Sequence, residues 1–347
     1  MKRLSAFAIA LILIFLVSCG SEEESFDETS EFSEETSEES FEETSEEVSE
    51  EKVYDLPDVI EENFDEDFEN KTQYAKNAFV FSSDRGLIYL SGEFEGNLFP
   101  ASITKLYTAY VALQYLDPEE TLAVGRERLL VALDSSTAGL DIGMTMDVES
   151  FIAAMMLPSG NDAAYTVAAA AGRKILGRGG VSAKEEINAF MDAVNIQATL
   201  DGLTNTVFVT PDGYHDDRHY TSMLDLLRIA YLVKDNETIM KYTSLPYFEV
   251  MPENYVSEGF EGLKWGNTNY LINPNSKYYR EGVFGLKTGG TSKAGQCVLI
   301  MGMNGDELLV IGVFGCDTYV HRFEDATALW DVAVGIYVEP VESEIAA

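Results

Sequence analysis

A serine and a lysine three positions apart, Ser102 and Lys105, are the residues in this sequence best suited to covalent chemistry. A serine hydroxyl is a weak nucleophile at neutral pH and needs a base in contact with it. On a helix the side chains at positions i and i+3 share a face, so the Lys105 amine can reach the Ser102 hydroxyl. A helix that begins near Ser102 also offers backbone N–H groups to a developing oxyanion. The pair therefore predicts acyl transfer through an ester on Ser102, with Lys105 as the base.

The spacing alone is weak evidence, because Ser49 and Lys52 repeat it in an acidic segment that cannot form a core. The simpler alternative is a solvent-facing lysine on an ordinary helix. A lysine acts as a base only when burial or a neighbouring cation disfavours its ammonium form. Lys105 has apolar neighbours and Lys287 offers a second cation, so we expect Lys105 to be held at least partly neutral.

The pattern of apolar residues around this pair indicates an α+β fold. Strands are expected over residues 77–82, 87–91, 206–210, 283–288, 296–301 and 308–314. Helices are expected from about 102, over 147–157, 163–171 and 182–194, and over 222–233 and 322–337, with irregular chain over 241–281. The helices cluster in the middle of the chain and the strands lie at both ends. We therefore predict an antiparallel sheet flanked by helices, with an all-helical lobe.

Two further motifs follow Ser102 and Lys105 in the chain, at residues 159–161 and 287–290. Pro158 disfavours helical geometry in the preceding residue, so the first motif, Ser-Gly-Asn, is expected in a loop between two helices. The second, Lys-Thr-Gly-Gly, is expected on a strand. Taken singly, the first could be a turn that caps a helix and the second a strand end with a glycine bulge.

In this order the three motifs resemble the active-site motifs of penicillin-recognising enzymes. The resemblance is closest to the serine D-Ala-D-Ala carboxypeptidases, which are the low-molecular-mass penicillin-binding proteins of the β-lactamase and transpeptidase superfamily. It covers roughly residues 77–338 and includes the stretches 212–215 and 219–222. It implies the β-lactamase/DD-peptidase-like fold, with no cofactor and no metal.

The resemblance also implies how the reaction proceeds. Ser102 would attack the carbonyl between the two terminal D-alanines of a peptidoglycan stem pentapeptide, and Lys105 would take its proton. Ser159 would relay the proton toward the departing amine. The terminal D-alanine would be released, and β-lactams would acylate Ser102 as covalent inhibitors.

The remaining family positions imply substrate binding. Asn161 would bind the peptide amide of the substrate, and Lys287 and Thr288 would receive its terminal carboxylate. Gly289 would leave room for the peptide to pair with the strand. The N–H groups of Ser102 and Gly290 would form the oxyanion hole. Arg322 matches a family arginine near the carboxylate pocket, although a surface arginine at the start of a helix is an equally good interpretation.

Other functions remain open on the same motifs. A serine β-lactamase shares all three, although no glutamate-bearing loop of the class A kind is evident between Ser159 and Lys287. A DD-endopeptidase and a non-catalytic penicillin-binding lipoprotein are also possible. A Ser-His-Asp hydrolase is disfavoured, because the chain has three histidines and no G-x-S-x-G elbow. His215 and His219 have the i, i+4 spacing of zinc ligands, but in a turn-like context, so we predict no metal.

The N-terminal residues predict export and membrane attachment. Residues 1–19 contain Lys2, Arg3 and then an apolar run, which is the pattern of a secretory signal peptide. Residues 16–20 resemble the bacterial lipobox, which implies a lipid anchor on Cys19; an ordinary cleavage site with a stray cysteine is the alternative. The protein is therefore expected to be an extracytoplasmic lipoprotein of the cell membrane.

A strongly acidic segment follows. Residues 21–70 hold 24 acidic residues against one base. Like charges at this density prevent packing, so residues 20–70 are predicted to be a disordered tether, followed by a catalytic domain over 71–340 and a tail over 341–347. The formal net charge of −37 argues against nucleic acid as a partner.

The C-terminal part allows two further expectations. With a hairpin turn at residues 304–305, Cys297 would face position 312, so a disulfide to Cys316 would need a bulge or a register shift. We expect two buried thiols. Only 58 residues follow Gly289, which suffices for the last strands and helix, so a separate C-terminal domain is not expected.

Overall fold

The computed structural model describes Leu56, residues 60–254 and residues 260–336. The chain divides into two compact units, Met1–Glu50 and Glu51–Ala347, and every described residue belongs to the second. The predicted signal peptide with Cys19, and the predicted tail over 341–347, lie outside the described residues. Among the helices that are described, none has the length and apolar character needed to cross a bilayer.

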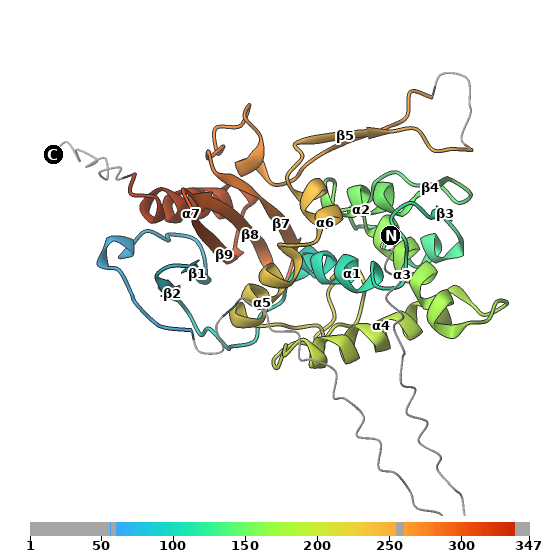
Figure 1. Cartoon of the computed structure of the whole chain (residues 1–347), viewed down its shortest axis with the longest axis horizontal. Helices are drawn as coiled ribbons and strands as arrows, with labels where there is room; N and C mark the ends of the chain where they lie inside the picture. Colours follow the sequence, from blue (N-terminus) through green and yellow to red (C-terminus); the bar gives the residue numbers. More distant parts are fainter. Residues whose placement is uncertain (1–55, 57–59, 255–259, 337–347) are drawn as a thin grey trace, which may run out of the picture. The chain divides into compact units, whose positions relative to one another are not determined.

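The central element is a five-stranded antiparallel sheet with the strand order β2-β1-β9-β8-β7 (Figure 1). Its strands are β1 (Asn77–Ser82), β2 (Gly86–Ser91), β7 (Val283–Thr291), β8 (Gly295–Asn304) and β9 (Glu307–Cys316). Each was predicted, and all except β1 extend further than predicted. β1 pairs with β9, so the complete sheet joins strands from both sides of the helical middle of the chain.

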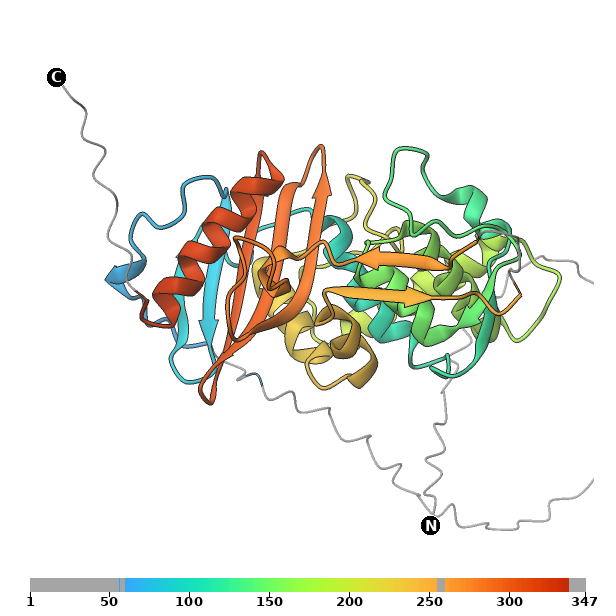
Figure 2. The same cartoon turned by 90° about the horizontal axis from the view of Figure 1, so that it is seen from above.

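Both faces of the sheet are apolar, and each packs against helices. Side chains alternate along a strand, so Phe79 and Phe81 of β1 join one core cluster while Ala78 and Val80 join the other. The first cluster contains the helical lobe. The second packs beneath α7 (Tyr319–Ala333), which lies across the outer face (Figure 2).

The start of α7 lies three residues before the predicted position. The Thr318 side chain accepts a hydrogen bond from the backbone N–H of His321 at 3.2 Å, so Thr318 is the N-cap and Arg322 lies within the first turn. The helix ends at Ala333 instead of residue 337.

The helical lobe consists of helices, several of which begin at a residue whose side chain caps the helix. Its elements are α1 (Thr104–Ala112), α2 (Val148–Met156), α3 (Asn161–Leu176), α4 (Ala183–Leu200), α5 (Met223–Val233) and α6 (Glu237–Thr243). Asp147 caps α2, Ser182 and Glu185 form the predicted capping box on α4, and Ser222 caps α5. These helix starts could be predicted because each depends on residues within one turn.

The stretch over 241–281 was wrongly predicted to be irregular. It completes α6 and forms a hairpin of β5 (Tyr247–Val250) and β6 (Leu263–Gly266), followed by the short 3-10 helix η4 (Tyr270–Ile272). A further two-stranded sheet pairs β3 (Thr121–Ala123) with β4 (Thr145–Asp147). These strands are too short to show a clear alternation in the sequence.

The predicted strand over 206–210 is reduced to a single bridge between Val207 and Tyr220. The reason is a side chain of α4. Asn195 donates to the carbonyl of Phe208 at 2.7 Å and accepts from its N–H at 2.9 Å. The amide side chain therefore satisfies backbone groups that a neighbouring strand would otherwise bind.

The predicted tether over 20–70 is too long at its C-terminal end, because residues before 70 are part of the folded structure. The N–H of Leu87 donates to Glu61 O at 2.8 Å, and the N–H of Asn63 donates to Leu87 O at 2.9 Å. Phe68 is 1% exposed and stacks on Tyr89. The folded part starts before the predicted boundary because β2 is an edge strand with free backbone groups, and Phe68 finds a place in the core.

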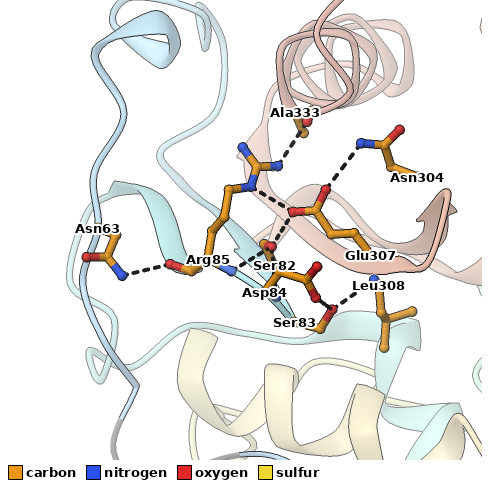
Figure 3. A network of polar contacts seen from close by, with 9 residues as sticks. All are labelled: Asn63, Ser82, Ser83, Asp84, Arg85, Asn304, Glu307, Leu308 and Ala333. Carbon is orange, nitrogen blue, oxygen red and sulfur yellow. Dashed lines mark hydrogen bonds and ion pairs between the residues drawn. The ribbon is translucent and has the colours of Figure 1, made fainter.

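The turns of the β1–β2 and β8–β9 hairpins are held together by a network of polar contacts (Figure 3). Arg85, in the β1–β2 turn, donates from Nε to Glu307 Oε1 at 2.7 Å and from Nη2 to Ala333 O at 2.9 Å. The Ser82 hydroxyl donates to the same carboxylate oxygen, and Asn63 donates to Arg85 O. The network joins two hairpins and the C-terminal end of α7.

The cysteine register differs from the prediction. Asn304 pairs with Glu307, so the hairpin loop lies one residue later than predicted, and a bulge follows between residues 296 and 298. As a result Cys316 pairs with Gln296. Both Cys297 and Cys316 are buried free thiols, as predicted. Burial raises the pKa of Cys297 to about 11 and that of Cys316 to about 12, so both thiols stay protonated.

Candidate active site

Ser102 lies on a tight turn at the entrance to the first helix. The 3-10 helix η2 (Ala101–Ile103) carries it and leads directly into α1. Ala101 has a φ of +48°, a conformation that alanine rarely adopts. Gly213 packs beneath this turn, because a Cβ at that position would lie 1.9 Å from Ala101 O. The turn is therefore held in an unusual geometry by a glycine more than a hundred residues away.

Lys105 is fully buried and its amine contacts the nucleophile. Its Nζ donates to Ser102 Oγ at 3.0 Å, to Asn161 Oδ1 at 2.7 Å and to Asp212 O at 2.9 Å. Burial lowers the pKa of Lys105 to about 8, while the charges of Asp212 and Asp162 oppose this change. A substantial fraction of the side chain is then neutral near pH 8, which is the state that a general base requires.

The position of Asp212 was not recognised as functional from the sequence. Thr108 on α1 donates to Pro211 O at 2.7 Å, and the N–H of Tyr214 donates to Asp212 Oδ1 at 3.0 Å. The Asp212 side chain is 1% exposed, and its second oxygen has no hydrogen-bond partner among the described residues. The loop therefore places both a carbonyl and a carboxylate close to Lys105.

The loop of residues 157–160 between α2 and α3 holds Ser159 in a strained conformation. Ser159 has a φ of +63°, and its buried hydroxyl has no partner among the described residues. The loop is fixed on both sides, because Gly160 N donates to Ala154 O and Asn161 N donates to Ser136 O, each at 2.9 Å. The Ser159 hydroxyl is therefore available for a substrate or a proton.

The strand β7 lies directly against the nucleophile turn. A Cβ at Gly289 would lie 2.9 Å from Pro100 O and 3.2 Å from Ser102 N, so only a glycine fits there without displacement. Lys287 is 1% exposed, and its Nζ donates to Thr288 O at 3.2 Å. Burial, together with the charges of Lys105 and Arg322, holds the pKa of Lys287 well below its usual range. The three sequence motifs therefore converge at one place.

Thr268 joins the second and third motifs and was missed in the sequence. Its N–H donates to Leu157 O at 3.1 Å, and its hydroxyl lies 2.6 Å from the Thr288 hydroxyl. The neighbouring Asn269 donates to Gly285 O at 3.2 Å. The asparagine-rich composition of this stretch gave no signal for such a bridge, because the bridge depends on two partners distant in sequence.

Comparison with known proteins decides the family. The family model described as D-alanyl-D-alanine carboxypeptidase matches residues 65–318. The chain belongs to this family. The match includes all three motifs.

Curated relatives agree with this assignment. The D-alanyl-D-alanine carboxypeptidase DacF of Bacillus subtilis is 30% identical over 267 residues, covering 76% of this chain and 63% of the relative. The D-alanyl-D-alanine carboxypeptidase of Streptomyces sp. strain K15 is 28% identical over 232 residues, covering 66% of this chain and 76% of the relative. The chain thus spans less than two thirds of the Bacillus protein.

Solved structures confirm the predicted DD-peptidase-like fold. The Streptomyces K15 DD-transpeptidase superposes with a TM-score of 0.66 at 24% identity, covering 76% of this chain and 98% of that one. Penicillin-binding protein D2 of Listeria monocytogenes, in its cefotaxime-bound form, gives a TM-score of 0.58 at 25% identity, covering 74% and 96%.

Arg322, which matches a family arginine, lies behind β7. Its Nη1 donates to Gly289 O at 3.0 Å and to Gln296 Oε1 at 2.9 Å. Only 8% of the residue is exposed, and burial lowers its pKa to about 10. It is therefore not a surface arginine. The structure shows Arg322 bound to the Gly289 carbonyl. A direct contact of Arg322 with a substrate carboxylate stays a prediction.

The histidines of the zinc alternative have other partners. His219 is buried, and its Nδ1 accepts a hydrogen bond from Val209 N at 3.2 Å. Its Nε2 lies 2.9 Å from the Thr104 hydroxyl. Since Nδ1 is an acceptor, Nε2 carries the hydrogen and donates it. Burial lowers the pKa of His219 to about 4, so the ring is neutral. Within the described part of the chain, no three His, Cys, Asp or Glu residues are grouped as a metal site.

Proposed function

We propose that this protein is a serine D-Ala-D-Ala carboxypeptidase that removes the terminal D-alanine from peptidoglycan stem peptides. The observation that carries the proposal is the contact of a buried, low-pKa Lys105 with Ser102, on a turn that packs against β7, the strand that carries Lys287. Family membership and the names of the curated relatives support the same activity.

Acylation follows from the geometry around Ser102. The neutral amine of Lys105 accepts the hydroxyl proton as Ser102 Oγ bonds to the carbonyl carbon between the two D-alanines. The N–H groups of Ser102 and Gly290 stabilise the oxyanion. The C–N bond then breaks, and the departing amine receives a proton from Lys105 through the Ser159 hydroxyl. D-Alanine leaves, and an ester remains on Ser102.

Deacylation reverses these proton transfers. A water molecule attacks the ester carbonyl while Lys105 accepts one of its protons, and the proton returns to Ser102 Oγ as the ester bond breaks. The shortened peptide is released as a free acid, and the enzyme regains its starting state. No cofactor enters either step.

The buried Lys287 explains why the substrate must end in a free carboxylate. An ammonium group without an anionic partner is costly to bury, which is why its pKa is depressed. A bound carboxylate supplies that partner, and the Thr288 hydroxyl supplies a second donor. A substrate without the terminal carboxylate would leave this cost uncompensated.

We also propose that β-lactams acylate Ser102 and that the protein is attached to the outer face of the cell membrane through a lipid on Cys19. The Listeria protein of similar fold is described in a cefotaxime-bound form, which supports the first proposal. The lipobox-like sequence at residues 16–20 supports the second. Replacement of Cys19 by alanine should release the protein from the membrane fraction; retention there would contradict the anchor.

The test of the main proposal is release of D-alanine from a stem pentapeptide. The wild type should release D-alanine, Ser102→Ala should release none, and Ser91→Ala, on the far edge strand, should behave as the wild type. Labelling by a fluorescent penicillin without D-alanine release would indicate a non-catalytic binding protein. Rapid hydrolysis of the penicillin would indicate a β-lactamase. Cleavage of the bond that cross-links two stem peptides, without release of D-alanine from the pentapeptide, would indicate an endopeptidase.

A further inference from the structure

The direction of the Lys105 amine depends on two parts of the chain besides its own helix. In addition to its contact with Ser102 Oγ, the amine donates to Asn161 Oδ1 at 2.7 Å and to Asp212 O at 2.9 Å. Asn161 is the first residue of α3, whereas Asp212 lies in the loop of residues 211–217. The amine stays directed at Ser102 only if α3 and this loop keep their separation.

The α3 side is fixed by a second loop, residues 131–140. The backbone N–H of Asn161 donates to Ser136 O at 2.9 Å. The neighbouring Asp162 carboxylate is fully buried and accepts from the N–H groups of Ala138 and Leu140 at 2.8 to 3.0 Å. The second half of this loop is therefore attached to the start of α3.

A contact between Tyr214 and Asp134 joins the two loops. The Tyr214 hydroxyl donates to Asp134 Oδ1 at 3.0 Å, and the Tyr214 N–H donates to Asp212 Oδ1 at 3.0 Å. The hydrogen bond to Asp134 raises the pKa of the Tyr214 phenol, so the hydroxyl keeps its proton and remains a donor. Tyr214 therefore ties the loop that carries Asp212 to the loop that is attached to α3.

These contacts close a ring of hydrogen bonds that starts and ends at the Lys105 amine. In order, the ring runs through Asn161, Ser136, Asp134, Tyr214 and Asp212. Each member is restrained from two sides, so a shift of either loop is resisted by the other. We propose that Tyr214 and Asp134 are a positioning pair for the reaction proposed above. They hold the other two acceptors of the Lys105 amine in place and so keep the amine directed at Ser102 Oγ.

The test measures the second-order rate constant of acylation by a fluorescent penicillin at pH 9. The pKa of Lys105 is about 8, so most of the lysine is neutral at this pH. The amount of penicillin bound at completion gives the active fraction, which separates the rate constant from any loss of folded protein. Tyr214→Phe removes only the hydroxyl and should lower the rate constant about two- to tenfold, the range that one hydrogen bond accounts for.

Two further variants show whether the effect comes from this contact. Both side chains are exposed, so water replaces the lost partner and no buried group is left unpaired. Asp134→Ala and the double variant Asp134→Ala, Tyr214→Phe should show the same fall as Tyr214→Phe, because all three lack the same hydrogen bond. Asp134→Asn removes the charge but keeps an acceptor oxygen, so it should recover most of the wild-type rate constant.

Tyr279→Phe is the matched control. Tyr279 is 38% exposed against 37% for Tyr214, and its neighbour Arg280 pairs with Asp331 of α7. Its rate constant should equal that of the wild type. A wild-type rate constant in Tyr214→Phe, or losses that add up in the double variant, would overturn the positioning pair alone. A wild type that neither reacts with penicillin nor releases D-alanine would contradict the proposed function, and the pair with it.

Discussion

The buried carboxylate of Asp212 offers a sharp test of how Lys105 works as a base. Its charge opposes the fall in the Lys105 pKa that burial causes, and the Lys105 pKa is about 8. Replacing Asp212 by asparagine removes that charge while keeping the oxygen that accepts from Tyr214 N. The pKa of Lys105 should therefore fall, by roughly one pH unit for a neighbouring charge.

The size of the effect depends on pH. With a pKa of about 8, roughly a tenth of Lys105 is neutral at pH 7; with a pKa of about 7, roughly half is neutral. The acylation rate of Asp212→Asn should therefore be about fivefold higher than that of the wild type at pH 7. At pH 9 most of the lysine is neutral in both proteins, so the two rates should be similar there.

The assay is the second-order rate of labelling by a fluorescent penicillin between pH 5.5 and 10. In the wild type the rate should rise with pH, reach half its maximum near pH 8 and then level off. Asp306→Asn, in the exposed β8–β9 loop, removes the same charge far from the site and should leave the profile unchanged. A wild-type rate that still rises above pH 10, or a folded Asp212→Asn protein whose midpoint does not fall, would refute the reasoning.

Three further substitutions test other parts of the structure. Burial raises the pKa of Glu307, but the hydrogen bonds to its carboxylate outweigh this effect and lower the pKa. Its contribution to stability is therefore present above its unfolded-state pKa and is lost as pH falls through the folded-state value. Glu307→Gln should lower the free energy of unfolding by about 1 kcal/mol in thermal or urea unfolding at pH 7, and by much less at pH 3. Gly213→Ala places a Cβ 1.9 Å from Ala101 O at a φ of +76°, so it should abolish penicillin labelling and lower the melting temperature, and a normal labelling rate would contradict the packing described for the nucleophile turn. Thr268→Val removes the contact with Thr288 and should raise KM about fivefold through loss of about 1 kcal/mol, with a smaller change in kcat; an unchanged KM would show that Thr288 needs no such support.

The sequence by itself determined the features that depend on neighbours in the chain. The i, i+3 spacing of Ser102 and Lys105 places both on one turn, and the caps at Asp147 and Ser182 set the starts of two helices within one turn of chain. Alternating apolar residues marked the strands of the main sheet. The order of the three motifs indicated the family before any geometry was known.

Only the tertiary structure decided how these parts meet. The carbonyl of Asp212 binds Lys105 across 107 positions of sequence, and Thr268 joins a loop and a strand that carry different motifs. The segment before residue 70 has an acidic composition typical of disorder, yet its backbone pairs with the edge strand β2. Such contacts depend on which surfaces remain unpaired after the core has formed. That is a property of the whole fold, so no local pattern of residue types could predict them.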